Sequence, residues 1–464
     1  MTADPASERG RMFGALSGSG DVDLQLSDLA WLQAMLDVEA ALARAGARAG
    51  LVPAAAAAEI VAICVATRYD CAELGRRAVA SGNPVVPLVA SMEAALDPTA
   101  RPYLHLGATS QDVIDTAMSL VAHRALDVIL GHLGGVAERC ASLAARHRDA
   151  LMPGRTLMQH ALPTTFGARC AGWLVAIDES RVRLRGLRDG RLAVQLGGAV
   201  GTLASLGPAG LVVASHLAEV LGLEEPVVPW HTSRRRVVEL AAELGIVSGA
   251  LGKIGLDVAL LAQTEIAEVQ EAGGDEAGGS STLPQKRNPV QAVLVVAAAR
   301  RTPGLVATLL GAMPQEHERA AGAWHAEWET MTDLLHIVGG AAASAESLLT
   351  TLRVDVGRMR ANVDISGGAI MAESLARRLA PALGRSSASA VVAQCVREAE
   401  ESGATMAETV LANSDIRAQL DADAIRSALD PSEYLGSAGL FVDRALAAHL
   451  SCSAGEDTAG VLGE

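Results

Sequence analysis

Aromatic residues are scarce in this chain of 464 residues, since Phe, Trp and Tyr together make up only 2% of it. Lysine is also scarce, because Lys253 and Lys286 are the only lysines among 38 basic residues. Acidic residues number 53, and the formal net charge is -15. Binding to nucleic acid phosphates requires a basic face, so we expect no nucleic-acid partner.

Secretion and membrane signals are absent as well. Residues 1–20 contain no apolar run of the signal-peptide kind, and no uncharged apolar run of about 18 residues predicts a membrane span. The cysteines are scattered, with no Cys-x-x-Cys pair, so we predict buried, reduced thiols rather than disulfides or a zinc site. These six residues are Cys64, Cys71, Cys140, Cys170, Cys395 and Cys452. We therefore expect a soluble, cytoplasmic protein without a membrane partner.

Apolar residues, by contrast, are abundant at 50% and recur at helical spacing. We predict an all-α fold with a core large enough for more than one domain. The predicted helices cover residues 27–46, 53–66, 112–147, 165–185, 236–271, 290–310 and 326–353. Shorter helices should follow, broken at Gly384, Gly403 and Pro431. The predicted domains are residues 1–108, a central long-helix bundle at 109–353, and a small helical domain at 354–464.

A polar segment at residues 278–290 separates two of these long helices. Gly278 and Gly279 loosen the backbone, while Pro284 and Pro289 prevent regular hydrogen bonding. In a chain that uses arginine almost everywhere, Lys286 places a compact ammonium in this loop. Such a loop could close over an anionic ligand and exclude water.

Two other polar stretches interrupt the helical pattern. Thr109 or Ser110 is a candidate N-cap for the helix predicted at 112–147, and helix N-termini attract anions. Residues 154–163 form a predicted polar turn. A plain helix cap without a ligand is the alternative for Thr109 and Ser110.

The loop at 278–290 resembles the signature loop of the fumarase/aspartase superfamily, Gly-Ser-Ser-x-Met-Pro-x-Lys-x-Asn-Pro. Leu283 stands at the Met position, and the other fixed positions match. The resemblance implies a homotetramer whose long helices form a twenty-helix core, with each active site shared by three subunits. It also implies a reaction without cofactor or metal, in which a proton alpha to a substrate carboxylate is removed.

The resemblance also implies roles for particular residues. Ser280 would be the catalytic base, and His160 could partly replace a histidine that most relatives carry at the position of Leu157. Substrate carboxylates would be bound from all three stretches and from one further arginine. These substrate-binding candidates are His105, Thr109, Ser110, Gln111, Arg155, Thr156, Gln159, Lys286, Asn288 and Arg319. For His105 and Arg319 a purely structural role stays open.

The departure at Leu157 resembles the bacterial 3-carboxy-cis,cis-muconate cycloisomerases, as do residues 229–236 and 316–328. The resemblance implies a cofactor-free cycloisomerase that interconverts 3-carboxy-cis,cis-muconate and 4-carboxymuconolactone. One alternative is a lyase that releases fumarate, acting on nitrosuccinate or, with less support, on adenylosuccinate. Another is a non-catalytic protein of the crystallin type, against which Ser280, Lys286 and Asn288 argue.

Overall fold

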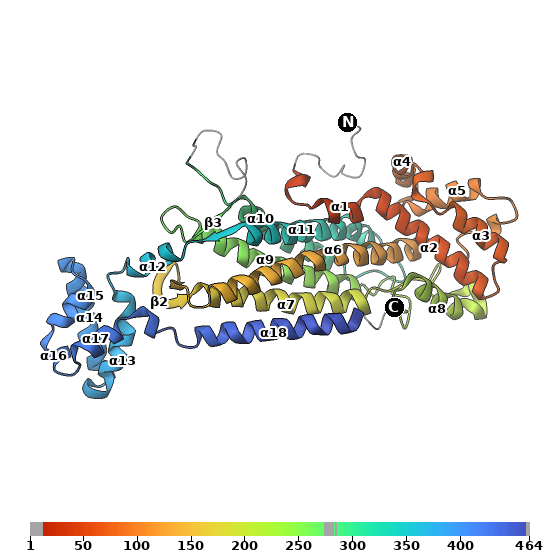
Figure 1. Ribbon diagram of the computed structural model, residues 1–464. Helices are drawn as coiled ribbons and strands as arrows, with labels where there is room; N and C mark the ends of the chain where they lie inside the picture. The colour runs from red at the N-terminus through yellow and green to blue at the C-terminus, as the bar shows by residue number, and fades with distance from the viewer. Residues whose placement is uncertain (1–12, 273–282, 284, 461–464) are drawn as a thin grey trace. The chain divides into compact units, whose positions relative to one another are not determined.

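The computed structural model describes residues 13–272, 283 and 285–460, with side chains as far as residue 452. Helices dominate these residues, and the strands are few and short (Figure 1). The predicted all-α class is confirmed. Ser280 lies outside the described residues, as do Gly278, Gly279 and Pro284.

The helices are α1 Gly20–Leu26, α2 Asp28–Arg48, α3 Ala54–Ile63, α4 Cys71–Ser81, α5 Val85–Ala95, α6 Ser110–Arg146, α7 Phe166–Gly190, α8 Gly210–Leu221, α9 Arg235–Leu261, α10 Val290–Gly311, α11 Ala323–Thr351, α12 Val356–Asp364, α13 Ala372–Leu383, α14 Arg385–Ser402, α15 Met406–Ala412, α16 Ser414–Arg417, α17 Ala422–Ala428 and α18 Ala438–Gly460. The strands are β1 Leu151–Thr156, β2 Gln159–Thr165, β3 Val269–Glu271 and β4 Leu352–Val354.

The chain divides into two compact units, each built from three segments. Unit 1 comprises Met1–Gly134, Glu179–Gly252 and Leu294–Glu346. Unit 2 comprises Gly135–Asp178, Lys253–Val293 and Ser347–Glu464. Each unit thus combines distant parts of the sequence. The division into three domains at residues 108 and 353 stays a prediction.

In unit 1, α2 packs against α8 through a continuous apolar core (Figure 1). The side chain of Ser27 accepts a hydrogen bond from the N–H of Ala30 at 3.2 Å and so caps α2. Leu32, Leu36 and Leu42 are among the residues that α2 buries. The helix predicted at 27–46 is confirmed, because its apolar spacing and its cap agree.

In unit 2, α13 to α17 enclose a second core around Leu375, Leu379 and Val392 (Figure 1). Helices end at Gly384 and Gly403, as predicted, and Gly403 adopts the left-handed conformation that favours glycine. The expectation of short helices to the end of the chain is wrong for α18. Residues 440–454 contain neither glycine nor proline, so this helix continues for 23 residues.

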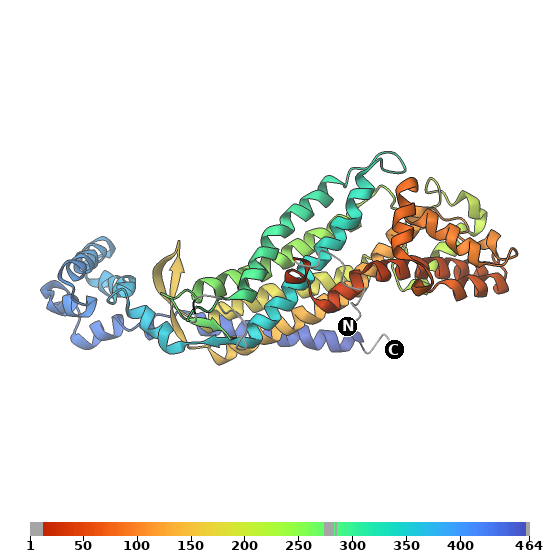
Figure 2. The ribbon, with the colours of Figure 1, turned by 90° about the horizontal axis from the view of Figure 1, so that it is seen from above.

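The predicted polar turn at 154–163 is instead an antiparallel hairpin of β1 and β2 (Figure 2). Thr156 pairs with Gln159, so Leu157 and Met158 alone make the turn. Their φ angles are 48° and 69°, the left-handed pair of a type I′ turn. Leu-Met does not predict such a turn, because type I′ turns usually contain Asn-Gly or Asp-Gly.

The helix predicted at 236–271 ends ten residues early, at Leu261. Ala267 adopts a left-handed φ of 51°, which a continuing helix cannot accommodate. Beyond it, Val269 pairs with Val354 in the small sheet of β3 and β4. Periodicity overestimated the helix because the residues of β3 are also partly buried.

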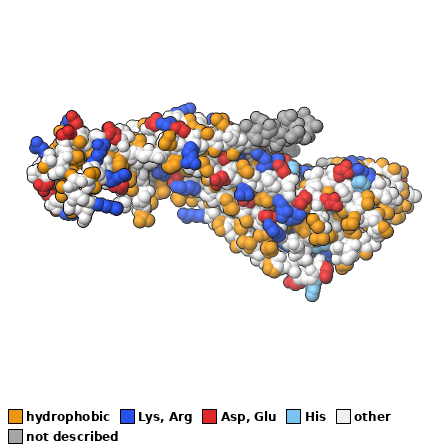
Figure 3. Space-filling model, turned by 90° about the horizontal axis from the view of Figure 1, so that it is seen from below, with side chains coloured by type: hydrophobic (Ala, Val, Ile, Leu, Met, Phe, Trp, Pro, Cys, Tyr) orange, Lys and Arg blue, Asp and Glu red, His pale blue; other side chains and the backbone are white. Residues whose placement is uncertain are grey.

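Three helical stretches are long and apolar enough to cross a membrane, judged by length and composition alone. They are Ala204–Leu221, Arg235–Leu261 and Val290–Gly311. In Val290–Gly311 only 22% of the apolar window is buried within the chain. Apolar side chains also lie between acidic and basic ones on the surface shown in Figure 3. Most of this apolar window is therefore not buried by the chain itself.

A buried ion cluster joins the first turns of α6 and α11 to the residue before α9. Arg234 is 0% exposed, and its guanidinium donates to both carboxylate oxygens of Asp115, at 2.7 and 3.0 Å. The same guanidinium donates to Glu327 at 2.5 and 3.0 Å. The ring of Trp230 lies 4.7 Å from the guanidinium carbon. Both carboxylates are thereby paired with the same guanidinium.

Replacing Arg234 with Met should lower the free energy of unfolding by about 3–5 kcal/mol, because two carboxylates would stay buried without a cation. Arg235→Met is the matched control. Arg235 is exposed and pairs with Glu239 at 3.3 Å, so its loss should cost less than about 1 kcal/mol. Urea unfolding followed by circular dichroism measures both, and equal losses would contradict the account.

The double substitution Leu157→Asn, Met158→Gly should raise the free energy of unfolding by about 1 kcal/mol or more, because the new residues suit the left-handed turn. Met158→Ala serves as the control, since alanine keeps a Cβ and therefore the strain. It should change stability by less than about 0.5 kcal/mol. Thermal unfolding of the three proteins measures this, and a gain from Met158→Ala alone would attribute the effect to lost apolar exposure.

Candidate active site

The start of α6 is held by one buried carboxylate, that of Asp112. Its two oxygens accept hydrogen bonds from the backbone N–H groups of Thr109, Gly197 and Gly198 at 2.9–3.0 Å. They also accept one from His231 Nε2 at 2.6 Å. Asp112 therefore fixes the turn before α6 against a glycine-containing loop. This places Thr109 and Ser110, both half-buried, at the N-terminus of a helix of 37 residues.

Gln111 is fully buried, and protein groups use its whole side-chain amide. Its NH₂ group donates to the carbonyl of His231 at 2.8 Å and to Asp115 at 3.1 Å. Its oxygen accepts from Arg319 at 2.7 Å. The structure thus brings together two predicted site residues, Gln111 and Arg319, that lie far apart in the sequence. The side-chain amide of Gln111 is thus engaged within the protein, where it holds Arg319.

Arg319 is a cation whose hydrogen-bond partners within the described residues are all neutral. Besides Gln111, they are the backbone carbonyls of Gly198 and Ala199, at 3.4 and 2.8 Å. No carboxylate of the described chain compensates its charge. The guanidinium is half-buried next to the start of α6, so it favours an anion there. A salt-bridged structural arginine is not what the described residues show.

His105 lies just before this helix, in a left-handed conformation with φ of 54°. Its Nδ1 lies 2.6 Å from a carboxylate oxygen of Glu39 in α2. Burial by itself would lower the pKa of His105, but the charge and hydrogen bond of Glu39, with Asp112 and Glu93 nearby, raise it above the usual value. The ring is therefore predisposed to be a cation.

In the β1–β2 hairpin of unit 2, unlike at Arg319, the candidate arginine is paired with a carboxylate. Arg155 donates two hydrogen bonds to Glu268, at 2.6 and 3.0 Å, and Glu268 is completely buried. The amide of Asn362 donates to the same carboxylate at 2.8 Å. Arg155 is thus neutralised inside its own chain. Its predicted contact with substrate would have to compete with a bidentate ion pair.

The remaining hairpin candidates lie near the turn. Thr156 and Gln159 are exposed, and His160 is half-buried. Burial lowers the pKa of His160, and Arg155 lowers it further, with Glu268 acting in the opposite direction. Leu157, at the turn, is 97% exposed. An apolar side chain thus occupies the exposed turn where the resemblance led us to expect the position of a histidine.

The loop with Lys286 is described only at its C-terminal end, and Ser280 lies outside the described residues. Lys286 is exposed and forms no ion pair with any residue that the structure describes, while Asn288 is half-buried. The carboxylate of Glu271 accepts from the N–H groups of Gln291 and Ala292 at 3.0–3.4 Å. This carboxylate caps α10 and ties the end of β3 to the end of the loop.

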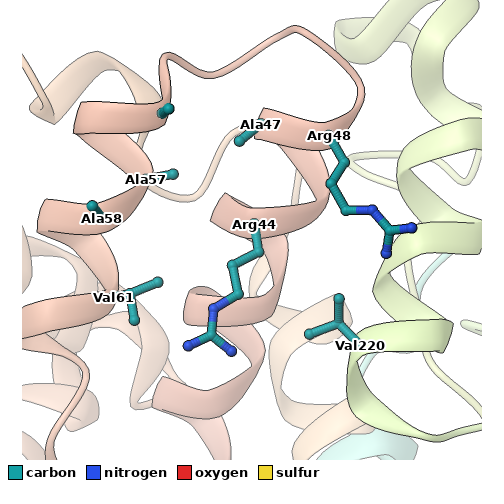
Figure 4. Close-up of a pocket in the computed structure, with 8 residues that line it drawn as sticks. Arg44, Ala47, Arg48, Ala57, Ala58, Val61 and Val220 are labelled. Carbon is teal, nitrogen blue, oxygen red and sulfur yellow. The ribbon is translucent and has the colours of Figure 1, made fainter.

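A hollow of about 430 Å³ lies between α2, α3 and α8 (Figure 4). Alanine and valine side chains form most of its wall, with Arg44 and Arg48 at its border, and Arg48 pairs with Glu219 at 2.9 Å. None of the predicted site residues lines it. Within the described ranges, no group of three or more His, Cys, Asp or Glu side chains could hold a metal ion.

Several residues that hold the candidate side chains or their neighbours in place were not predicted from the sequence. They are Glu39, Asp112, His231, Glu268 and Asn362, and each pairs with a polar group far away in sequence. The sequence contained one signal that could have identified such a residue. Acidic residues on the apolar face of an amphipathic helix, such as Glu39, are almost never buried unless they are paired. Their partners could not be named without the fold.

The similarity of this chain to known proteins covers both units. Residues 7–304 match a family model described as "Lyase", and residues 368–445 match one described as "Adenylosuccinate lyase C-terminus". A 3-carboxy-cis,cis-muconate cycloisomerase of Pseudomonas aeruginosa is 47% identical over 97% of this chain and 98% of its own length. A nitrosuccinate lyase of Streptomyces davaonensis is 43% identical over 92% of each chain.

A solved structure gives the same result. The 3-carboxy-cis,cis-muconate lactonizing enzyme from Pseudomonas putida matches with a TM-score of 0.90 at 43% identity, over 96% of this chain and 100% of that one. The superfamily predicted from the loop at 278–290 is confirmed. The chain is therefore an enzyme of the fumarase/aspartase superfamily, similar along almost its whole length to 3-carboxy-cis,cis-muconate cycloisomerases.

Proposed function

We propose that the protein is a 3-carboxy-cis,cis-muconate cycloisomerase that interconverts this tricarboxylate and 4-carboxymuconolactone. The observation that carries the proposal is the 47% identity to a relative of that name over nearly the full length of both chains. In the site, Leu157 at the hairpin turn supports it, because the histidine used by other superfamily enzymes is absent there. The place of the reaction is the cytoplasm, in the breakdown of aromatic acids.

The proposed reaction adds an internal carboxylate oxygen to a carbon–carbon double bond. A C–O bond forms, the double bond is lost, and a proton is delivered to the neighbouring carbon. In reverse, a base removes this proton, alpha to a carboxylate, and the C–O bond breaks. Atoms and electrons balance without an oxidant or a cofactor, and the negative charge that develops on the carboxylate needs cations and hydrogen-bond donors around it.

We assign Ser280 as the base, from its place in the signature loop, with Lys286 and Asn288 binding the carboxylate beside the reacting carbon. Lys286 supports this role because its charge is not compensated within the described residues. Thr109 and Ser110 would bind a second carboxylate at the N-terminus of α6, where unpaired N–H groups favour anions. His160 remains a candidate proton carrier, since its lowered pKa keeps it available in neutral form.

Arg319 and His105 would supply further positive charge for a substrate with three carboxylates, and Gln111 would act by holding Arg319. Arg155, Thr156 and Gln159 would complete the site from the hairpin of another subunit. We attribute the exposed apolar surface of α10 to a homotetramer with shared active sites. Helices that are apolar on most sides are buried in a larger bundle.

A specific observation favours a second candidate, elimination of nitrite from nitrosuccinate. The nitrosuccinate lyase from Streptomyces davaonensis is 43% identical over 436 residues, close to the cycloisomerase values. Both reactions begin at a carbon alpha to a carboxylate and need a base and cations. The substrate that the protein turns over fastest identifies which of the two reactions it catalyses.

Purified protein mixed with 3-carboxy-cis,cis-muconate should remove the diene's ultraviolet absorbance, and Ser280→Ala should lower kcat by about 10²–10⁴-fold, as expected for loss of a general base. Circular dichroism controls for folding of the variant. If the wild type does not turn this substrate over, the cycloisomerase proposal is wrong, and release of nitrite from nitrosuccinate then tests the second candidate.

Lys286→Met should lower kcat/KM for the same substrate by roughly a hundredfold, because a cation next to the developing charge is lost. Arg287→Met is the matched control, as it removes the neighbouring exposed cation and should change kcat/KM less than about threefold. Steady-state kinetics of both variants measure this. Equal losses would mean that the loop attracts substrate only through its overall charge.

A further inference from the structure

Glu39 is a buried acid that the proposed reaction does not use directly. It lies on α2, its side chain is 0% exposed, and one oxygen lies 2.6 Å from His105 Nδ1. The other oxygen is buried and has no hydrogen-bond partner. Removing a carboxylate from water is costly unless it is paired. Within the described residues, His105 is the partner that compensates Glu39.

His105 reaches Glu39 in an unusual backbone conformation. Its φ of 54° is left-handed, which is uncommon for a residue with a side chain and costs free energy. The conformation persists because hydrogen bonds hold the residues that follow His105. The N–H of Ala108 donates to the carbonyl of His105 at 3.3 Å, and Thr109 is held by Asp112. Strain held in this way is commonly found at functional sites.

The pairing also determines which ring nitrogen is available. Nδ1 is used by Glu39, whereas Nε2 has no hydrogen bond to any described residue. The side chain of His105 is 20% exposed, so this second nitrogen can be reached from outside. His105 therefore presents an N–H donor four residues before Thr109. A cationic donor there would add to the N-terminus of α6 in attracting a carboxylate.

The other charged groups around His105 act in the same direction. Asp112 at the start of α6 and Glu93 on α5 are the further acids that favour its charged form. Beyond Glu39, the neighbouring thiol of Cys64 is neutral, since burial raises its pKa to about 12. No other cation of the described chain forms a hydrogen bond or ion pair with Glu39. Among the cations of the described chain, Glu39 therefore pairs with His105 alone.

We propose that Glu39 is a positioning residue that holds His105 as an imidazolium, with Nε2 free to donate to a substrate carboxylate. This role rests on the proposed function, since it assigns His105 to the binding of one of the three carboxylates. The proposal also predicts a pH dependence. Because Glu39 raises the pKa of His105 above its usual value, the cation is present below that raised pKa and is lost as pH rises through it.

Glu39→Gln keeps a hydrogen-bond acceptor of the same size but removes the charge. It should raise KM for 3-carboxy-cis,cis-muconate roughly ten- to a hundredfold at neutral pH, with a smaller change in kcat. The alkaline fall of kcat/KM should move to lower pH, and Glu39→Asp should restore part of the loss. Asp37→Asn is the matched control, since it removes an acid of α2 that pairs with Arg124 instead. Its kinetics should stay within about twofold of wild type.

A double-mutant cycle separates positioning from general stability. If Glu39 acts through His105, adding Glu39→Gln to His105→Gln should cost less than about twofold more. Full additivity of the two losses would overturn the proposal. Thermal unfolding of every variant accompanies the kinetics, so that a misfolded variant is recognised.

The protonation of His105 can be measured without any substrate. In protein labelled with ¹³C-histidine, the ring signal missing from His105→Gln belongs to His105. Its titration should lie above about 6.5, the usual histidine value, and should move to lower pH in Glu39→Gln. An unchanged titration would overturn the proposal even if the enzyme is active. An inactive wild type with the expected titration would refute the assigned reaction and leave the pairing of Glu39 with His105 intact.

Discussion

The guanidinium of Arg234 lies between two buried carboxylates and supports the start of α6. Arg234 compensates Asp115 and Glu327, and Asp115 also accepts hydrogen bonds from Gln111 and Trp324. Buried charges are tolerated only in such fully paired arrangements. One turn earlier, Asp112 gathers its four donors in the same way. The N-terminus of α6 is therefore positioned by charge pairing beneath it rather than by apolar packing alone, which gives the anion-binding end of this helix a rigid base.

The basic groups near the candidate site fall into two kinds. Arg155 is neutralised by a buried carboxylate of its own chain, and the raised pKa of His105 likewise reflects a buried acid. Arg319 and Lys286 have no such partner within the described residues, so their charge is available to a ligand. This distribution supports the proposed substrate with three carboxylates, because the available cations can bind its charges while the paired ones hold their neighbours in place.

The turn of the β1–β2 hairpin is apolar. It places two apolar residues, Leu157 and Met158, in left-handed conformations and exposes both. A histidine at that position could carry a proton, whereas leucine can only exclude water and shape the site. In the proposed reaction, the base is therefore assigned to the signature loop rather than to this turn. The similarity to both cycloisomerases and a nitrosuccinate lyase fits a common proton-abstraction step with different leaving groups.

The sequence by itself determined the helical class, most helix positions, the superfamily and the polar stretches that carry the candidate residues. These are local properties, since apolar periodicity, caps and a long contiguous motif are readable along one segment. Only the tertiary structure decided that residues 154–163 form a hairpin, that α9 ends at Leu261, and that Gln111 is held by Arg319. It alone paired Glu39 with His105. Such pairings join residues far apart in the chain, and their free energy depends on burial and on distance, neither of which is encoded in any single segment.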